Sequence, residues 1–387
     1  MKTRGFLAKE SWIVWIILLS LFYFFLVLES YQMDFRGFYV AGKSFSNGLN
    51  PYLNNIAISP VYFDSNNFLA TSRFIYPPIA LFLFAPLALL PYFWAKLVFS
   101  FLIGVCLFLV FYLLKKRFDI KTEFLLLIFL SFPIVASFER GQIDLLILLL
   151  VILAWFKKDK WYGGLFLATA CVLKVYPVLL WIFFAVRKNW KIVISSGIFL
   201  ATIFFSSLLF LPVGLFADFM GSLFVSKAKV VLDINLPGYY LDQATKTIVS
   251  PEGNFIFTHK FIHHSLNFMD WLGKYASLLA GCLLLVFSYF TRNKDYPEEF
   301  LFFSALVLML LGNSALWIMG LVFYIPVSFY LLKKYEKNVF LCLLILLPLF
   351  LPNFIILFGY NLNYFVALLV LIYFFRLKTI EIFEHGV

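Results

Sequence analysis

The sequence has few charged residues for its length. Asp, Glu, Lys and Arg make up only 13% of the 387 residues, whereas hydrophobic residues make up 63%. Soluble domains carry about 25% charged residues, so this chain has too few charges to cover a water-facing surface. Intrinsic disorder is excluded as well, because it requires low hydrophobicity. We therefore expect an all-α, multi-pass membrane protein whose apolar segments cross about 30 Å of hydrocarbon.

Cysteine is scarce and metal-binding motifs are missing. The four cysteines lie inside apolar runs, without C-x-x-C spacing or neighbouring histidines, and are expected to be small buried hydrophobes. The sequence contains no Asp-x-Asp motif and no His-rich ligand set, so we expect neither a catalytic metal nor another cofactor. The formal net charge is +11, but the basic residues form no single patch, which argues against a nucleic-acid partner.

The positions of Lys and Arg predict the topology. The apolar run 12–28 follows Lys2, Arg4 and Lys9, and Glu29-Ser30-Tyr31 offers no small-x-small cleavage site. We interpret this run as a retained first helix with a cytoplasmic N-terminus. Cytoplasmic loops are enriched in basic residues. The same side should therefore hold the basic clusters at 115–117, 157–160, 187–191, 292–294, 333–337 and 376–378.

About twelve transmembrane segments fit this arrangement, with both termini in the cytoplasm of a cell-membrane protein. They are 12–28, 92–114, 123–138, 143–156, 162–173, 177–186, 192–211, 273–290, 299–316, 319–332, 338–351 and 356–375. Residues 74–91 are apolar too, but their four prolines break a spanning helix, so we expect an interfacial or re-entrant helix on the outer side. The single domain, 1–387, then has two long extracytoplasmic loops, 30–75 and 212–270.

In this topology the unusual polar residues fall near the outer face. Lys96, Arg140 and Lys174 are basic residues at short outer turns or helix ends. Lys96 can extend its ammonium group to the interface, whereas Arg140 and Lys174, at hairpin tips, are candidates for function. The bilayer middle is nearly free of ionisable groups, although transporters usually carry such groups at the midplane. The pattern therefore favours an enzyme that works on a lipid-linked substrate at one interface.

Several motifs follow one another between residues 30 and 190. They are Asp34-Phe35 with Phe38-Tyr39-x-Ala41-Gly42, Asn47-Gly48-Leu49-Asn50-Pro51-Tyr52, Tyr76-Pro77-Pro78, Phe84-x-Pro86-Leu87 with Leu90-Pro91, Gly141-Gln142 with Leu145-Leu146, and Gly164-Leu165-x-x-Ala168 leading to Leu173-Lys174-x-x-Pro177. In this ordered series the chain resembles glycosyltransferase family 87, of the GT-C superfamily. The C-terminal half departs from the family pattern. The family's Ser-Pro-x-Ser-Trp-Asp-His-His run is replaced by Asn313-Ser314-Ala315-Leu316-Trp317-Ile318-Met319-Gly320.

The resemblance implies a GT-C fold and a membrane glycosyltransferase. The family implies transfer of a sugar, often mannose, from a polyprenyl-phosphate carrier to a lipid or glycan acceptor at the extracytoplasmic face. Such a reaction needs a base for the acceptor hydroxyl, for which Asp34 is the candidate. It also needs cations for the departing lipid phosphate, and Arg140 and Lys174 are the candidates. One carboxylate without a covalent partner predicts a single displacement with inversion.

Further residues are weaker candidates, and each candidate also has a structural interpretation. His264 and Gln142 are further donor-site candidates, and the possible substrate contacts are Arg36, Tyr76, His263 and Trp317. Asp34 can also cap a helix, Arg140 can pair with Glu139 or Asp144, and Lys174 can reach the lipid headgroups. The histidines can be ordinary residues of the second loop. Tyr76, Gln142 and Trp317 can serve packing or capping.

Two other functions remain open at this stage. The first is a transporter or flippase of lipid-linked glycans, which predicts polar residues along a transmembrane path. The second is an O-antigen polymerase or ligase-like enzyme, which usually relies on Arg and His in a large outer loop. Lys227, His263 and His264 keep the second alternative open.

The predicted topology can be tested by labelling single cysteines. In a variant that lacks the native cysteines, Asn54→Cys and Asn254→Cys lie in the two predicted outer loops. Both should react in intact cells with a thiol reagent that does not cross membranes. Protection of both positions in intact cells, with labelling only after lysis, would contradict the topology and move the predicted site to the other side.

Overall fold

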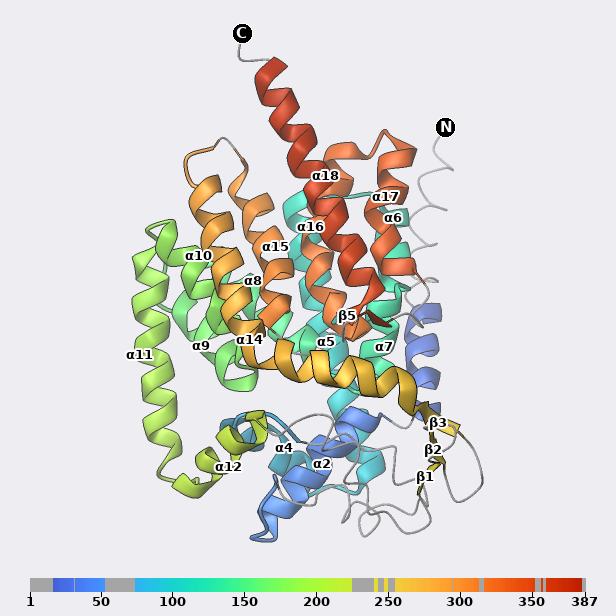
Figure 1. Cartoon of the computed structure of the whole chain (residues 1–387), viewed down its shortest axis with the longest axis vertical. Helices are drawn as coiled ribbons and strands as arrows, with labels where there is room; N and C mark the ends of the chain where they lie inside the picture. Colours follow the sequence, from blue (N-terminus) through green and yellow to red (C-terminus); the bar gives the residue numbers. More distant parts are fainter. Residues whose placement is uncertain are drawn as a thin grey trace.

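The computed structural model describes residues 17–30, 32–52, 74–224, 240–242, 247–249, 255–294, 296–312, 317–351, 356–357 and 360–384 (Figure 1). The fold is mostly helical, which confirms the predicted class. The helices, with 3-10 helices marked η, are Ile17–Glu29, α2 (Met33–Ser46), η2 (Pro78–Ala80), α4 (Leu81–Leu87), α5 (Tyr92–Phe118), α6 (Thr122–Phe129), α7 (Phe132–Arg140), α8 (Asp144–Phe156), α9 (Gly163–Leu173), η3 (Tyr176–Leu179), α10 (Leu180–Val186), α11 (Trp190–Ser207), α12 (Val213–Phe224), α14 (His259–Thr291), α15 (Glu298–Met309), η4 (Leu310–Gly312), η5 (Ile318–Tyr324), α16 (Ile325–Tyr335), α17 (Val339–Phe350) and α18 (Leu362–Glu384).

Short strands accompany the helices in two places. The strands β1 (Tyr240–Asp242), β2 (Thr247–Val249) and β3 (Phe255–Thr258) form an antiparallel sheet in that order. The strands β4 (Ile356–Leu357) and β5 (Tyr360–Asn361) form an antiparallel pair. The first sheet contacts α14, and β5 contacts α18.

Apolar helices long enough to cross a membrane are present, as a multi-pass membrane protein requires. Among the described residues these are Tyr92–Phe118, Trp190–Ser207 and Ile318–Tyr335, and there are up to five spans if two bent helix pairs each count as one. Several predicted crossings are shorter helices. For example, α9 has 11 residues, which at 1.5 Å per residue spans only about 17 Å. The count of twelve crossings therefore stays a prediction.

One predicted crossing, 123–138, is two helices rather than one. The axes of α6 and α7 meet at 41°. Pro133 lies in the first turn of α7, where its missing N–H cannot continue the hydrogen-bond ladder of α6. The break redirects the chain so that α7 ends at Arg140.

The stretch predicted as the second loop, 212–270, contains α12 and also the beginning of α14, which starts at His259. Ile262, Leu266 and Met269 recur at three- and four-residue spacing, which is typical of a helix. Their polar neighbours hide this helix from a search for long apolar runs. His263 and His264 therefore belong to a helix and not to a loop, and their side chains lie outside the described part of the structure.

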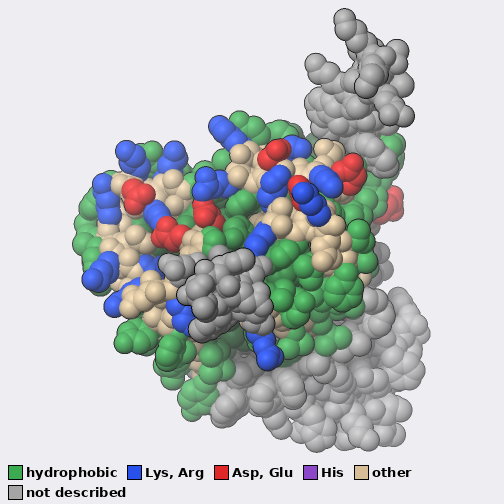
Figure 2. Space-filling view, turned by 90° about the horizontal axis from the view of Figure 1, so that it is seen from above, with side chains coloured by type: hydrophobic (Ala, Val, Ile, Leu, Met, Phe, Trp, Pro, Cys, Tyr) green, Lys and Arg blue, Asp and Glu red, His purple; other side chains and the backbone are tan. Residues whose placement is uncertain are grey.

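Three of the basic clusters predicted to lie inside, 115–117, 157–160 and 333–337, lie on one face of the molecule. Arg117, at the end of α5, pairs with Glu299 on α15, and Lys158, after α8, pairs with Glu298 at 2.5 Å. Lys333 on α16 donates to the carbonyl of Asp119 at 3.2 Å. Figure 2 shows Lys and Arg side chains gathered on this face. The helices α2, α4 and α12 lie at the opposite end of the bundle (Figure 1).

Lys96 holds the bend that leads into α2. Helix Ile17–Glu29 and α2 meet at 61°. The ammonium group of Lys96, on α5, donates to the carbonyls of Leu28 at 3.2 Å and Ser30 at 3.3 Å. Lys96 is 6% exposed, so it binds carbonyl groups at the end of the first helix instead of extending to the interface as predicted. This contact fixes where α2 begins.

The helices α9 and α11 pack closely against each other at Gly164. A Cβ atom added to Gly164 on α9 would overlap Ser195 Oγ and the backbone nitrogen of Ser196, and would lie 2.7 Å from the carbonyl carbon of Ser195. Since two of these atoms are backbone, the overlap cannot be relieved by turning a side chain. The two helices can approach this closely only because position 164 has no side chain.

We expect Gly164→Ala to destabilise the protein by about 1–3 kcal/mol, the usual effect of overpacking a buried contact. Gly197→Ala, on α11, is the matched control, because its Cβ would meet only Trp181 Cη2 at 3.8 Å. Thermal unfolding in detergent should show a lower midpoint for Gly164→Ala alone. Equal midpoints for the two variants would contradict the close packing of α9 and α11.

Candidate functional site

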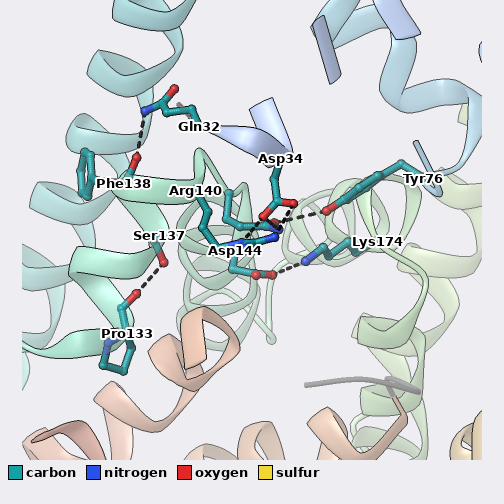
Figure 3. Close-up of polar contacts among 10 residues, drawn as sticks. Gln32, Asp34, Tyr76, Pro133, Ser137, Phe138, Arg140, Asp144 and Lys174 are labelled. Carbon is teal, nitrogen blue, oxygen red and sulfur yellow. Dashed lines mark hydrogen bonds and ion pairs between the residues drawn. The ribbon is translucent and has the colours of Figure 1, made fainter. Parts of the chain in front are cut away.

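The site is built around the carboxylate of Asp34, the second residue of α2. Arg140, the last residue of α7, donates to it through two nitrogens. The distances are 2.7 Å from Nε to Oδ2 and 3.0 Å from Nη2 to Oδ1 (Figure 3). Bidentate pairs between guanidinium and carboxylate are among the strongest hydrogen-bonded ion pairs in proteins. This pair joins residues that lie 106 positions apart in the chain.

Gln142 extends this pair toward Tyr76. The amide nitrogen of Gln142 donates to Oδ2 of Asp34 at 2.7 Å. The amide oxygen of Gln142 accepts a hydrogen bond from the hydroxyl of Tyr76 at 3.2 Å. Tyr76 precedes η2, so the chain of contacts joins the start of α2, the turn after α7 and the segment before η2.

A second ion pair lies next to the first (Figure 3). Lys174, in the turn after α9, donates to Oδ1 of Asp144 at 2.6 Å. The hydroxyl of Tyr176 donates to the same oxygen at 3.0 Å. The ammonium group of Lys174 also lies 5.6 Å from the ring centre of Tyr76, so this ring connects the two pairs.

The charges lie in an ordered series from the interior outward. Asp34 and Asp144 are buried, at 5% and 4% exposure. The side chains of Lys174 and Arg140 are 14% and 23% exposed. Trp317, whose ring centre lies 5.7 Å from the guanidinium of Arg140, is 46% exposed. An anion that approaches from outside would therefore meet the cations before the carboxylates.

Local backbone structure sets the distance between α2 and α7. Gly141 ends α7 in the left-handed region, with φ +69°, and its missing Cβ would lie 2.6 Å from Cβ of Phe35. Glycine is thus required both for the turn and for the contact with α2. Gln32, just before α2, donates to the carbonyl of Phe138 at 2.9 Å and to Ser100 at 2.8 Å. These contacts bring Asp34 within reach of Arg140.

Burial and charge fix the protonation of two groups at the turns. Burial by itself would lower the pKa of Lys174, but Asp144, Tyr76 and Asp34 together outweigh this effect and raise the pKa above its ordinary value. Lys174 is therefore a cation at neutral pH. Burial raises the pKa of Tyr76, so its hydroxyl keeps the proton that it donates to Gln142.

Most of the residues predicted from the sequence meet at this site. They are Asp34, Tyr76, Arg140, Gln142, Lys174 and Trp317. Asp34 does not cap α2, because the N-cap residue is Gln32. The ion-pair partner of Arg140 is Asp34 and not Glu139 or Asp144. Arg36 lies on the same helix as Asp34, with its guanidinium 5.6 Å from the ring centre of Tyr92.

Sequence reasoning missed two members of the site. It considered Asp144 as a partner of Arg140, whereas Asp144 pairs with Lys174. Tyr176 was not considered, although a tyrosine two residues after a lysine at a hairpin tip could have drawn attention to it. Within the described residues, no group of three or more His, Cys, Asp or Glu side chains is arranged to hold a metal ion.

Comparison with known proteins gives one match. The sequence model of glycosyltransferase family 87 matches residues 74–314, which is more than half of the chain. The match includes Tyr76, Arg140, Gln142, Asp144 and Lys174, whereas Asp34 lies before it and Trp317 after it. The chain matches no curated protein and no solved structure.

The ion pair of Asp144 and Lys174 can be tested by a double-mutant cycle that measures the free energy of unfolding. Asp144→Asn or Lys174→Met alone leaves one buried charge unpaired and should cost about 3–5 kcal/mol. The double variant should cost less than the sum, because it leaves neither charge behind. Lys333→Met is the matched control, since the pair of Lys333 and Glu336 is more exposed and spans 3.7 Å. Thermal unfolding in detergent measures all four variants, and additive losses would contradict the pairing.

Proposed function

The chain belongs to glycosyltransferase family 87, and from this premise we propose that it transfers a hexose, with mannose as the first candidate, from a polyprenyl-phosphate donor. The acceptor is a lipid or glycan at the extracytoplasmic face of the cell membrane. The family identifies a membrane glycosyltransferase, and the donor, the sugar and the reacting residues are the substance of the proposal.

The observation that carries the proposal is the contact between Asp34 and Arg140. A displacement at the anomeric carbon needs a base for the incoming hydroxyl and positive charge for the outgoing phosphate. The bidentate pair supplies one carboxylate and one guanidinium in direct contact. The second cation, Lys174, is joined to them through Tyr76 and Gln142.

Asp34 is the proposed general base. The acceptor oxygen forms a bond to the anomeric carbon while its proton passes to the carboxylate of Asp34. The bond from the anomeric carbon to the phosphate oxygen breaks, and its electron pair stays on the phosphate. A single displacement of this kind inverts the anomeric configuration. Water then takes the proton from Asp34.

Arg140 and Lys174 are the proposed phosphate contacts. The hydrogen bonds of Arg140 to described residues use Nε and Nη2, which form one edge of the guanidinium. A guanidinium has five N–H donors, so the Nη1 edge can bind a phosphate oxygen while the first edge keeps Asp34. Lys174 has three donors and uses one on Asp144. Both contacts strengthen as negative charge develops on the leaving phosphate.

The remaining predicted contacts surround this centre or lie outside the described side chains. Trp317 and Arg36 are proposed as substrate contacts at the edge of the site. His263 and His264 remain proposals for the donor site, carried by α14. We propose no metal and no cofactor, since the lipid-linked sugar is itself the activated donor. Membrane lipids surround the helices.

Replacement of the base gives the central test. Asp34→Asn keeps the size and hydrogen-bonding reach of the side chain but removes the charge. Loss of a general base usually costs about 10²–10⁴-fold in rate, so transfer from polyprenyl-phosphate mannose should be at least about a hundredfold slower. Donor binding should persist, because Arg140 and Lys174 remain. Mass spectrometry of the membrane lipids and glycans, with and without the active gene, identifies the product.

The matched control is Asp64→Asn, because Asp64 is the other acidic residue of the stretch 30–75. It should transfer at the wild-type rate. Thermal unfolding of both variants separates loss of the base from loss of folding. Near-normal transfer by Asp34→Asn, with loss of transfer in Asp64→Asn or Asp144→Asn, would assign the base to another carboxylate.

A further inference from the structure

We propose that Gln142 and Tyr76 are positioning residues for Asp34. In this proposal the hydroxyl of Tyr76 fixes the orientation of the Gln142 amide, and the amide holds the Asp34 carboxylate in one orientation. The inference rests on the proposed role of Asp34 as the base. It gives Gln142 a task different from the donor contact that the sequence suggested.

The orientation of the Gln142 amide follows from its neighbours. An ionised carboxylate only accepts hydrogen bonds, so the amide must turn its NH₂ group toward Asp34. The amide oxygen then faces Tyr76, and a phenol hydroxyl can donate to it. Each contact thus requires the other. Without the Tyr76 hydroxyl, the amide oxygen would lose its donor in a buried position.

The amide of Gln142 is buried, and both its nitrogen and its oxygen have partners within the protein. Gln142 is 8% exposed, its nitrogen lies 2.7 Å from Asp34, and its oxygen lies 3.2 Å from Tyr76. This burial leaves little of the amide within reach of a substrate. The geometry therefore fits a residue that acts through Asp34 better than one that binds the donor.

Tyr76 is itself held from several sides. Its backbone carbonyl accepts a hydrogen bond from the hydroxyl of Tyr52 at 2.6 Å. Its ring packs edge-to-face against Phe38, with ring centres 4.8 Å apart at 89°. Lys174 lies over the same ring. Because the ring is fixed by these contacts, Tyr76→Phe should remove the hydroxyl without moving its neighbours.

Several charged and titratable groups of the described residues lie near Asp34. Its own helix carries Arg36, and α7 carries Glu139 and Arg140. The neighbouring elements contribute Asp144, Lys174 and Tyr76, together with Lys96 and Tyr92 of α5 near Arg36. Gln142→Leu leaves all these groups in place, and Tyr76→Phe removes only the neutral hydroxyl of Tyr76. A shift in the titration of Asp34 would then come from the lost hydrogen bond.

The expected effect is an upward shift in the pH at which Asp34 loses its proton. A hydrogen bond to the charged form favours that form, so removing the donor stabilises the neutral acid. Gln142→Leu should move the midpoint upward by about one pH unit. Tyr76→Phe should move it in the same direction by less, because the amide remains but is free to turn. Gln142→Glu should move it furthest, because it places a second carboxylate beside Asp34.

Infrared spectroscopy of the purified full-length protein reads this titration without substrate. The spectrum at acid pH minus the spectrum at neutral pH shows the bands of protonated carboxylic acids. The band that is missing in Asp34→Asn belongs to Asp34. For transfer from polyprenyl-phosphate mannose, the pH midpoint on the acidic side of the kcat/KM profile should move upward together with the infrared midpoint. The donor KM should stay unchanged. Tyr324→Phe is the matched control, since it removes the hydroxyl of a buried tyrosine that donates only to the carbonyl of Ile345, at 3.0 Å, among the described residues.

Upward shifts of the infrared midpoint in Tyr76→Phe and Gln142→Leu, with none in Tyr324→Phe, support the proposal. An unchanged midpoint in both variants overturns it. A raised donor KM with an unchanged pH profile also overturns it, and would return Gln142 to a donor contact. If the wild-type protein transfers no sugar from this donor, the proposed function fails, but the infrared midpoint still decides whether Tyr76 and Gln142 position Asp34.

Discussion

A charged side chain taken out of water costs several kcal/mol unless an opposite charge and hydrogen bonds compensate it, and this constraint shapes the end of the bundle that holds the site. Two carboxylates are buried there, and each contacts one cation. The pairing neutralises the site before any substrate enters. It also allows two carboxylates and two cations to lie together in an otherwise apolar protein.

The pairs exist because helix ends bring their members together. Arg140 ends α7, Asp144 begins α8, and Lys174 follows α9. All three lie at the end of the bundle that holds the site, because the helices before them are short or broken, as at Pro133 between α6 and α7. Asp34 arrives from a distant part of the chain, guided by the bend at Lys96 and by the missing side chain of Gly141.

The sequence predicted which residues are unusual better than it predicted how they pair. Arg140 and Lys174 stood out because basic residues are rare at short outer turns, and Asp34 stood out through its motif. The predicted partners of Arg140 were its neighbours Glu139 and Asp144, because sequence reasoning sees only local candidates. The true partner is 106 residues away, and only tertiary packing reveals it. The same limit applied to Lys174, whose partner Asp144 lies 30 residues earlier, at the beginning of α8.

Helix boundaries failed for a different physical reason. A search for long apolar runs joined α6 to α7, since Pro133 interrupts hydrogen bonding without lowering hydrophobicity. It also placed residues 259–270 in a loop, because the beginning of α14 is amphipathic instead of uniformly apolar. The hydrophobicity of a segment indicates whether it can lie in lipid. The ends of a helix depend instead on single backbone hydrogen bonds, which hydrophobicity does not reveal.

The long separation between Asp34 and Arg140 has a consequence for how the protein is made. Chains grow at about 5–20 residues per second, so Asp34 is synthesised about 5–20 s before the arginine that neutralises it. During that interval the carboxylate lacks the guanidinium of Arg140, and α2 cannot pack against a turn that has not yet been translated. The N-terminal third of the protein can therefore complete its packing only after α7 has been synthesised. Until Gly141 has emerged, the carboxylate of Asp34 has to be solvated by water or by the insertion machinery.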